Sequence, residues 1–280
     1  MTPLHALPAR AWAHVAGVFT DIDDTLTAAG EITSDALRAL HDLRAAGLTV
    51  IAVTGRPVGW SEPFALSWPL HAIVAENGAV ALHPAAHDTR TAPPGTGTAP
   101  RLSKTYQADA ATRTTNFQRL QAVAARVLRE VPGAALARDS AGRETDIAID
   151  HGEFHHLSAE QIDAVVRIMR GEGLRATVSS IHVNGWIGGH DKWQGACWAA
   201  RTLLDIDLPA QIERWVYVGD STNDQVMFEH FEHSVGVANI RHFAAQLHHL
   251  PRYITASERG AGFAEVAARL LADRASRRLG

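Results

Sequence analysis

The sequence predicts an α/β fold in which a Rossmann-like, doubly wound parallel sheet forms the core and carries an inserted α+β cap domain. Apolar runs such as residues 15–20 and 48–54 alternate with stretches of helical period, which is typical of parallel strands joined by helices. The middle of the chain breaks this pattern, and the C-terminal third resumes it. We therefore expect a core of residues 1–83 and 186–280, with residues 84–185 as the inserted domain.

Local signals place the elements of the core. Thr33 or Ser34 can cap a helix that ends at Gly47, because short hydroxyl side chains accept the first free N–H groups and glycine adopts the conformation that ends a helix. A third strand is expected within residues 71–82. A further helix begins near residue 192, and a later strand runs into the polar turn GDSTND.

The inserted segment begins with residues 84–101, which are rich in Pro, Gly and Thr and predict a long loop. Apolar residues at helical spacing predict a helix near 110–130. Residues 144–152 alternate like a half-buried strand. Ser158, with Gln161 three residues later, predicts the capped start of another helix.

Composition restricts the class of protein. Hydrophobic residues make up 46% of the 280 residues, charged residues 20%, and the formal net charge is −4, so we expect no nucleic-acid partner that depends on bulk positive charge. No apolar run reaches the roughly 18 residues that span a bilayer, and we expect no membrane partner and no signal peptide. The single cysteine, Cys197, fits a reducing compartment, and a cytoplasmic location is expected.

The most informative segment is VFTDIDDTLT, residues 18–27. An apolar run is followed at once by Asp21, Asp23 and Asp24. Like charges about 4 Å apart repel by roughly 4 kcal/mol near a protein surface, so such a cluster indicates a bound cation. Mg²⁺ with a phosphate is the simplest candidate.

Three further elements carry polar residues in matching places. Thr54, Gly55 and Arg56 follow the second strand, Lys192 begins a helix, and the turn 219–224 follows a later strand. Ligands of open parallel sheets bind beyond the carboxyl ends of the strands. These motifs are therefore expected to meet in one crevice.

The order DIDDT, TGR, lysine and GDSTND resembles the haloacid dehalogenase (HAD) superfamily of phosphohydrolases. The position of the insert and the sequence ENGA at 76–79 resemble its large α/β cap subclass (IIB, Cof-like), which contains many sugar-phosphate phosphatases. The resemblance implies a Mg²⁺-dependent phosphomonoester hydrolase. Its substrate would be a small phosphorylated metabolite, with a sugar phosphate as the leading candidate, and its intermediate an aspartyl-phosphate.

The resemblance also implies roles. Asp21 would be the nucleophile and a metal ligand. Asp23 would protonate the leaving oxygen, activate water and offer its backbone carbonyl to the metal. Lys192 would bind phosphate and stabilise developing charge, and Asp220 would be a direct ligand of Mg²⁺.

Supporting residues complete the expected site. Thr54 would bind a phosphate oxygen, and Gly55 would let the backbone approach closely. Arg56 would either bind phosphate or brace the loop. Asn223 would form hydrogen bonds within its turn, and Asp224 would hold metal-bound waters or orient Lys192.

The chain departs from the family pattern at two places. Asp24 and Trp193 stand where glycine is common, and Asp24 is expected to have only a turn or surface role. Lys104 is the only other lysine in the chain, and its place beside the long loop makes it a poor replacement for Lys192.

Specificity is expected to reside in the cap, since a lid excludes water and contacts the non-reacting part of a substrate. The polar candidates on alternating strands are Asp146, Asp150, His182 and Asn184. The tryptophans 186, 193 and 198 are expected to pack in the core rather than to stack on a sugar ring. The histidine groups at 151–156 and 248–249 are expected to be solvated or packed rather than to bind a transition metal.

Two other functions fit the same motifs. A phosphosugar mutase would return the phosphoryl group to the sugar, and a non-catalytic phosphoryl-binding or signalling module would keep the site without turnover. A dehalogenase fits less well, because its chemistry does not need the ligand that Asp220 supplies. The sequence makes no prediction of the oligomeric state.

Overall fold

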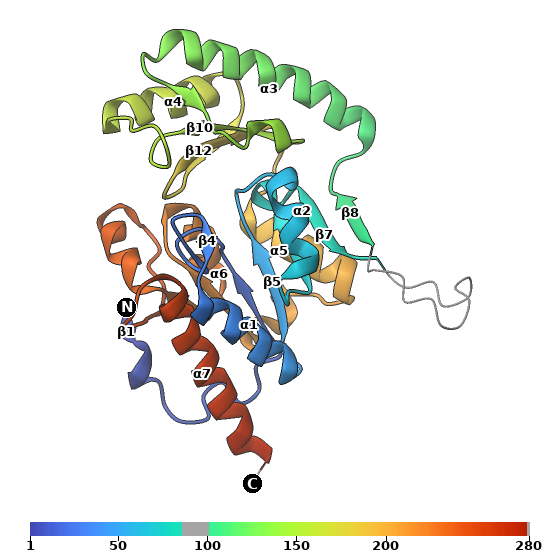
Figure 1. Ribbon diagram of the computed structural model, residues 1–280, viewed down its shortest axis with the longest axis vertical. Coiled ribbons are helices and arrows are strands. Elements are labelled where there is room, and N and C mark those ends of the chain that lie inside the picture. Colours follow the sequence, from blue (N-terminus) through green and yellow to red (C-terminus); the bar gives the residue numbers. More distant parts are fainter. Residues whose placement is uncertain (86–100, 279–280) are drawn as a thin grey trace, which may run out of the picture.

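The computed structural model describes residues 1–85 and 101–278, and within these ranges the chain forms two main sheets. The large sheet has the strand order β1-β15-β14-β13-β2-β5-β6-β7-β8, and the small sheet has the order β11-β12-β10-β9. The small sheet and two long helices lie together over one end of the large sheet (Figure 1). The α/β fold that the sequence predicts is confirmed. Most of the expected loop at 84–101 lies outside the described residues.

The strands are short, and the parallel ones run from one edge of the large sheet, β1, as far as β6. Its strands are β1 (Thr2–Pro3), β2 (Gly17–Thr20), β5 (Thr49–Val53), β6 (Ala72–Ala75), β7 (Val80–Pro84), β8 (Leu102–Tyr106), β13 (Trp215–Gly219), β14 (His233–Gly236) and β15 (Tyr253–Ile254). The small sheet contains β9 (Ala135–Leu136), β10 (Asp146–Asp150), β11 (Arg175–Val178) and β12 (His182–Trp186), and a hairpin pairs β3 (Thr27–Ala28) with β4 (Glu31–Ile32).

Seven α-helices accompany these strands in the described part of the chain. They are α1 (Ser34–Ala45), α2 (Val58–Ser67), α3 (Ala110–Glu130), α4 (Ala159–Gly171), α5 (Lys192–Leu204), α6 (Gln225–His230) and α7 (Arg259–Arg278). The expected caps are present: the Thr33 side chain accepts a hydrogen bond from the Ala36 N–H, and Ser158 forms a capping box with Gln161.

Both faces of the large sheet are buried. Val18 of β2 packs in the hydrophobic core with α1, α2 and α7, whereas its neighbour Phe19 packs in the core with α5 and α6. Successive side chains of a strand point to opposite faces, so every residue of β2 must be apolar or hydrogen-bonded. This is why the predicted parallel strands read as continuous apolar runs.

The last two strands at one end of the large sheet differ from the expected parallel pattern. β7 pairs antiparallel with β6, and β8 pairs antiparallel with β7. The chain therefore returns to the large sheet after residue 101, although the expected core segment ends at residue 83. We propose that the inserted unit begins after Tyr106, where β8 ends.

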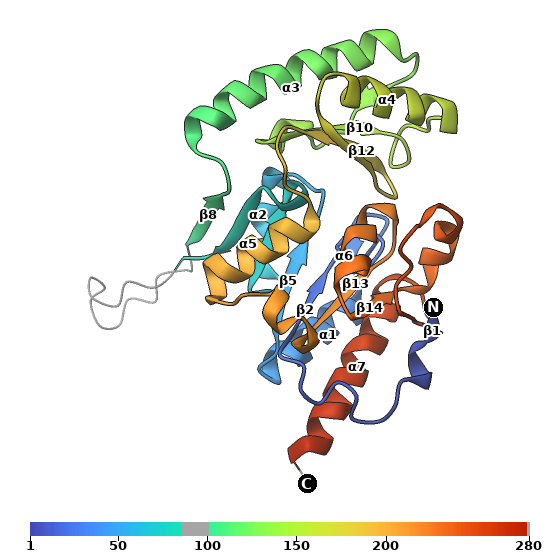
Figure 2. The same cartoon turned by 180° about the vertical axis from the view of Figure 1, so that it is seen from behind.

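The small sheet lies between two helices and the large domain (Figure 2). α3 and α4 cover one of its faces through apolar residues such as Val127 and Val165, together with Ile147 of β10. The alternate residues Asp146 and Asp150 are also fully buried. The expectation of a half-exposed strand is therefore wrong at β10, because other protein groups cover its polar face as well.

Within the described ranges, we find no helix with the length and apolar character needed to cross a membrane.

Candidate active site

The site begins where two neighbouring parallel strands end. β2 and β13 pair in parallel, with Thr20 opposite Val218, and the Asp21 N–H donates to the Val218 carbonyl at 2.8 Å. Asp21 and Asp220 directly follow these strands. The register therefore brings two carboxylates from residues 199 positions apart to one point of the sheet edge.

Lys192 joins this point from the first turn of α5. Its Nζ donates to Asp21 Oδ1 at 2.7 Å and to Asp224 Oδ1 at 2.6 Å, and all three side chains are buried. Burial alone would lower the pKa of Lys192, but the two carboxylates outweigh it and raise that pKa above its usual value. Lys192 therefore stays charged at the centre of the cluster. Lys104 instead pairs with Glu144 at 3.0 Å on the surface, so it does not replace Lys192.

The cluster contains three carboxylates but only one ammonium group, that of Lys192. Oxygen atoms of Asp21, Asp220 and Asp224 lie within 4.8 Å of one another, and one ammonium leaves two negative charges uncompensated if all three are ionised. Burial raises the pKa of Asp21 to about 8, against the opposing effect of Lys192 and with further contributions from Asp224 and Asp23. Burial and the charges of Asp21 and Asp224 raise the pKa of Asp220 well above its ordinary value.

This donor set fits a hard divalent cation. Carboxylate oxygens are the preferred protein ligands of Mg²⁺, and a charge of +2 would match the excess at the cluster. Asp220 is held in place by the Asn239 side-chain amide, which donates to its Oδ2 at 3.1 Å. Asp21 and Asp220 are therefore the residues best able to ligate such an ion.

Asp224 is occupied by protein donors. Its Oδ1 accepts from Lys192 and from the Tyr217 hydroxyl at 2.5 Å, and its Oδ2 accepts from the N–H groups of Asp220 and Ser221. Asp224 thus fixes Lys192 and the turn, which agrees with the orienting role expected of it. Tyr217 was not a sequence candidate. Tyr217 lies in the apolar run of β13, a position that is typical of a packing residue. Its hydroxyl group is the only sequence feature that indicates a polar role.

The loop after β5 supplies Thr54 and Gly55. The Thr54 hydroxyl oxygen accepts from the Arg56 N–H at 3.0 Å, so its own hydrogen remains available to a ligand. A Cβ added to Gly55 would lie 3.2 Å from Asn184 Oδ1 and 3.4 Å from the Asn77 side chain. A larger residue at position 55 would crowd these two side-chain amides, which explains why glycine occupies this position. Asn223 accepts from the Ser221 hydroxyl at 2.9 Å within its own turn, as expected.

Asn77 is a second residue of the site that was not a sequence candidate, although it belongs to the ENGA segment at 76–79. It has a left-handed φ of 55° and is 2% exposed, and its Nδ2 has no hydrogen-bond partner among the described residues. With Lys192 and Asn223 it lines a cavity of about 330 Å³. A buried amide without a partner is costly, so Asn77 is available to a ligand beside Lys192.

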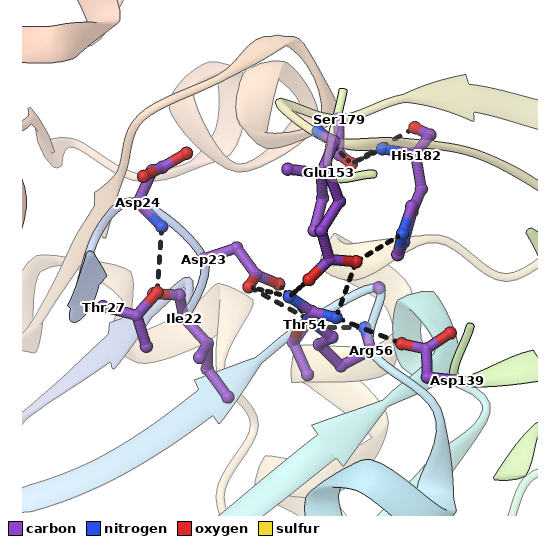
Figure 3. A network of polar contacts seen from close by, with 12 residues as sticks. Ile22, Asp23, Asp24, Thr27, Thr54, Arg56, Asp139, Glu153, Ser179 and His182 are labelled. Atoms are coloured by element: carbon purple, nitrogen blue, oxygen red, sulfur yellow. Dashed lines mark hydrogen bonds and ion pairs between the residues drawn. The ribbon is translucent and has the colours of Figure 1, made fainter. Parts of the chain in front are cut away.

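Asp23 and Arg56 form the polar network drawn in Figure 3. Arg56 Nε donates to both carboxylate oxygens of Asp23 at 3.0 Å, and Nη2 donates to Asp23 Oδ1 at 2.9 Å. The guanidinium also contacts Asp139 and Glu153, two residues that no sequence motif indicated. Asp24 pairs instead with Arg259 at 2.8 Å near the surface, consistent with a turn or surface role.

Two of the cap candidates fasten the cap to the Gly55 loop. Asp146 accepts from Arg143 Nη1 at 2.8 Å and from Asn184 Nδ2 at 3.2 Å, and the same two donors reach the Gly55 carbonyl. Glu76, of the ENGA segment, accepts from the backbone N–H groups of Glu144 and Thr145. These side chains hold the cap against the core rather than facing an open cavity.

Asp146 provides a pH-dependent contribution to stability. Burial raises its pKa from 3.8 to about 7, with Arg143 opposing the shift and Glu76 adding to it. Between these two values the folded protein binds more protons than the unfolded chain, so the free energy of unfolding falls as pH rises. Between pH 4 and pH 7, the free energy of unfolding of wild type should fall by up to about 4 kcal/mol relative to that of Asp146→Asn.

Urea denaturation of both proteins across this range measures the difference. Asp163→Asn, which changes an exposed aspartate of α4, is the matched control and should run parallel to wild type. A difference between wild type and Asp146→Asn that does not vary with pH would contradict the shift.

The other two cap candidates shape one loop. Asp150 accepts hydrogen bonds from four successive N–H groups, those of residues 152 to 155. His182 Nε2 lies 3.1 Å from Glu153 Oε2. Asp150 and His182 therefore position Glu153, which points toward Arg56 (Figure 3).

The remaining sequence candidates are packing residues. Trp186 is buried, Trp193 packs edge-on against Phe231, and Trp198 packs against the same hydrophobic core. Within the described residues, the aspartates 21, 220 and 224 form the only group of three acidic, histidine or cysteine ligands with metal-binding spacing. The expectation that the tryptophans pack in the core agrees with these contacts.

One sequence family and several solved structures are similar to this chain. Residues 18–92 match the sequence family of haloacid dehalogenase-like hydrolases, whereas no curated protein sequence matches the chain. Solved structures match nearly the whole chain at low identity, which concerns the fold alone.

Three such structures are representative. A protein from Thermoplasma acidophilum has a TM-score of 0.65 and 15% identity, covering 92% of this chain and 99% of that one. The sucrose-phosphatase from Synechocystis sp. PCC6803, in complex with sucrose and phosphate, has a TM-score of 0.62 and 16% identity over 91% and 98% of the two chains. The HAD subclass IIB sugar phosphatase BT4131 has a TM-score of 0.61 and 14% identity over 92% and 100%.

The matching segment carries the DIDDT and TGR motifs, and the later motifs fold back onto it at the same sheet edge. Residues 18–92 therefore match the haloacid dehalogenase-like hydrolases, and the chain shares its α/β fold with the three structures compared.

Proposed function

We propose that the protein is a Mg²⁺-dependent phosphomonoester hydrolase that acts on a small phosphorylated metabolite, with a sugar phosphate as the proposed substrate class. The observation that carries this proposal is the buried cluster in which Lys192 bridges Asp21 and Asp224 beside Asp220. It combines a nucleophile, a fixed cation and an acidic cation site. The match to haloacid dehalogenase-like hydrolases and the fold shared with sugar phosphatases support it.

In the proposed first step, a carboxylate oxygen of Asp21 attacks phosphorus and the ester P–O bond breaks. The leaving oxygen takes a proton from the Asp23 carboxyl group. Lys192 and the Thr54 hydroxyl would bind phosphoryl oxygens through this step. In the second step, water attacks the aspartyl-phosphate, its proton goes to Asp23, and inorganic phosphate leaves with Asp21 restored.

A cation held by Asp21, Asp220 and the Asp23 backbone carbonyl would neutralise phosphoryl charge when bound. Other side chains would hold the two carboxylate ligands in place. Asn239 and Thr25 contact Asp220, at 3.1 and 3.5 Å, and Lys192 fixes Asp21.

The cavity beside Asp23 supports a polyhydroxylated leaving group. It has a volume of about 490 Å³ and is lined by Asp23, Arg56, Glu153 and Phe154, among others. Phe154 is half exposed and carries the Arg138 guanidinium 3.7 Å from its ring centroid. A polar wall with one aromatic ring suits a sugar, which offers hydroxyl groups and an apolar face.

A screen of phosphorylated metabolites tests the function. We expect Mg²⁺-dependent release of inorganic phosphate from at least one sugar phosphate and loss of turnover after chelation by EDTA. Product analysis also separates the alternatives. A mutase would give an isomeric sugar phosphate without free phosphate, and a binding module would give no turnover with any substrate. The cytoplasmic location stays a prediction from the sequence.

A further inference from the structure

Arg56 is surrounded by carboxylates. Nε and Nη2 engage Asp23, Nη2 also reaches Glu153 Oε1 at 2.9 Å, and Nη1 reaches Asp139 Oδ2 at 3.2 Å and Glu153 Oε2 at 3.4 Å. The guanidinium lies 4.9 Å from the Trp60 ring centroid, and the side chain is only 4% exposed. Since all three nitrogens are engaged, Arg56 could bind a phosphate only by leaving Asp23.

The partners of Arg56 come from two different parts of the molecule. Asp23 follows β2 of the large sheet, whereas Asp139 and Glu153 lie on loops that flank β10 of the cap. Figure 3 shows the three carboxylates converging on the guanidinium from these elements. Arg56 is therefore an ionic connection between the cap and the proposed acid–base residue.

The cap side of this connection is itself rigidly built. Four backbone N–H groups bind the Asp150 carboxylate and fix the loop that carries Glu153. His182 contacts the other side of Glu153. Asp139 accepts from Arg143 Nη2 at 3.2 Å, and Arg143 in turn contacts the Gly55 carbonyl. Displacement of the cap would therefore remove two of the three carboxylates from Arg56 together.

We infer that Arg56 is a positioning residue that orients the carboxyl group of Asp23 only while the cap is in place, with Glu153 holding the guanidinium from the cap side. This inference rests on the proposed function. A charge-assisted, bidentate contact fixes both the distance and the plane of a carboxylate. Proton delivery to the leaving oxygen and proton removal from water would then both depend on cap position.

Substrates with different leaving groups separate this role from direct substrate binding. An alkyl phosphate needs a proton on its leaving oxygen, whereas p-nitrophenyl phosphate releases a stable phenolate without one. For Arg56→Lys we expect kcat on glucose 6-phosphate, or on the best sugar phosphate of the screen, to fall on the order of 100-fold. The first turnover of p-nitrophenyl phosphate should change less than about 3-fold. Breakdown of the aspartyl-phosphate should then be slow, so a burst of p-nitrophenol should appear.

Glu153→Gln tests the cap side while leaving the Arg56–Asp23 contact in place. We expect a smaller loss in kcat, on the order of 10-fold, with little change in KM for p-nitrophenyl phosphate. If Glu153 acts through Arg56, the double variant should be no slower than Arg56→Lys alone. Arg126→Lys and Glu172→Gln, which alter an exposed ion pair of the cap, are matched controls and should retain wild-type kinetics.

Hydrogen exchange provides a readout that does not need turnover. Faster exchange is expected in both Arg56→Lys and Glu153→Gln, at residues 152–155 of the cap and at residues 22–27 of the core. If wild type hydrolyses nothing but this paired change is present, the proposed function fails and the connection between cap and Asp23 stands.

Three results would overturn the inference. The first is an equal loss on alkyl and aryl phosphates without a burst. The second is an additive double variant with raised KM, which would mean that Glu153 or Arg56 binds substrate directly. The third is exchange at residues 22–27 that is unchanged in both variants.

Discussion

Replacing Asp21 with asparagine is expected to reduce phosphate release by about 10⁴-fold or more, because the variant lacks the oxygen nucleophile that forms the acyl phosphate. The loss should not come from unfolding. Asp21 is a buried carboxylate whose pKa is raised to about 8, mainly by burial. An amide of the same shape avoids that cost, so the free energy of unfolding should stay the same or rise.

Two measurements check this prediction together. Phosphate release reports activity, and mass spectrometry of acid-quenched protein reports a phosphoryl group on Asp21 in wild type and its absence in the variant. Asp35→Asn, an exposed aspartate in the first turn of α1, is the matched control and should keep full activity. Turnover of Asp21→Asn within tenfold of wild type would eliminate the nucleophile assignment.

Replacing Lys192 with glutamine is expected to affect both activity and stability. Asp21 and Asp224 would lose the ammonium that lies 2.7 and 2.6 Å from their oxygens. Removing one partner of a buried ion pair costs roughly 3–5 kcal/mol, since the remaining charge is left uncompensated. The loss of a fixed cation next to the phosphoryl group should lower kcat by about 10³-fold.

Urea denaturation and steady-state kinetics measure these two effects. Lys104→Gln removes the only other lysine, whose ion pair with Glu144 is partly exposed. This control substitution should lower the free energy of unfolding by about 1 kcal/mol or less and leave kcat unchanged. Addition of Mg²⁺ should restore part of the stability of Lys192→Gln, because a bound cation would compensate the same carboxylates. A Lys192→Gln protein as stable and active as wild type would contradict the central place of this lysine.

The fold and the centre of the site follow from features that lie close together in the sequence. Apolar runs followed by helices of period 3.6 predict parallel strands, and parallel neighbours end at the same sheet edge. This is enough to bring Asp21 to Asp220, because β2 and β13 are adjacent and in register. The place of Lys192 does not follow from strand direction, because the strand before α5 is β12 of the small sheet, and only the resemblance to the family predicts it.

The exposure that the sequence predicts for the cap strand β10 is wrong, and the sequence does not decide between the two roles expected of Arg56. A strand pattern reports which residues share a face, but it does not report what covers that face. Asp146 and Asp150 share a face as expected, yet that face is buried by Arg143, Asn184 and the backbone of the following loop. Neither carboxylate is free to contact a substrate.

The sequence by itself determined the α/β class, the order of the motifs and the carboxylates that converge at one sheet edge, because backbone period and strand direction are local properties. Only the tertiary structure decided the partners of Arg56, which lie 33, 83 and 97 positions away in the chain. It likewise revealed Glu153, Tyr217 and Asn77. Contacts of this kind depend on how the cap docks on the core and on the rotamer of each side chain. The hydrophobic period of a single segment reports neither.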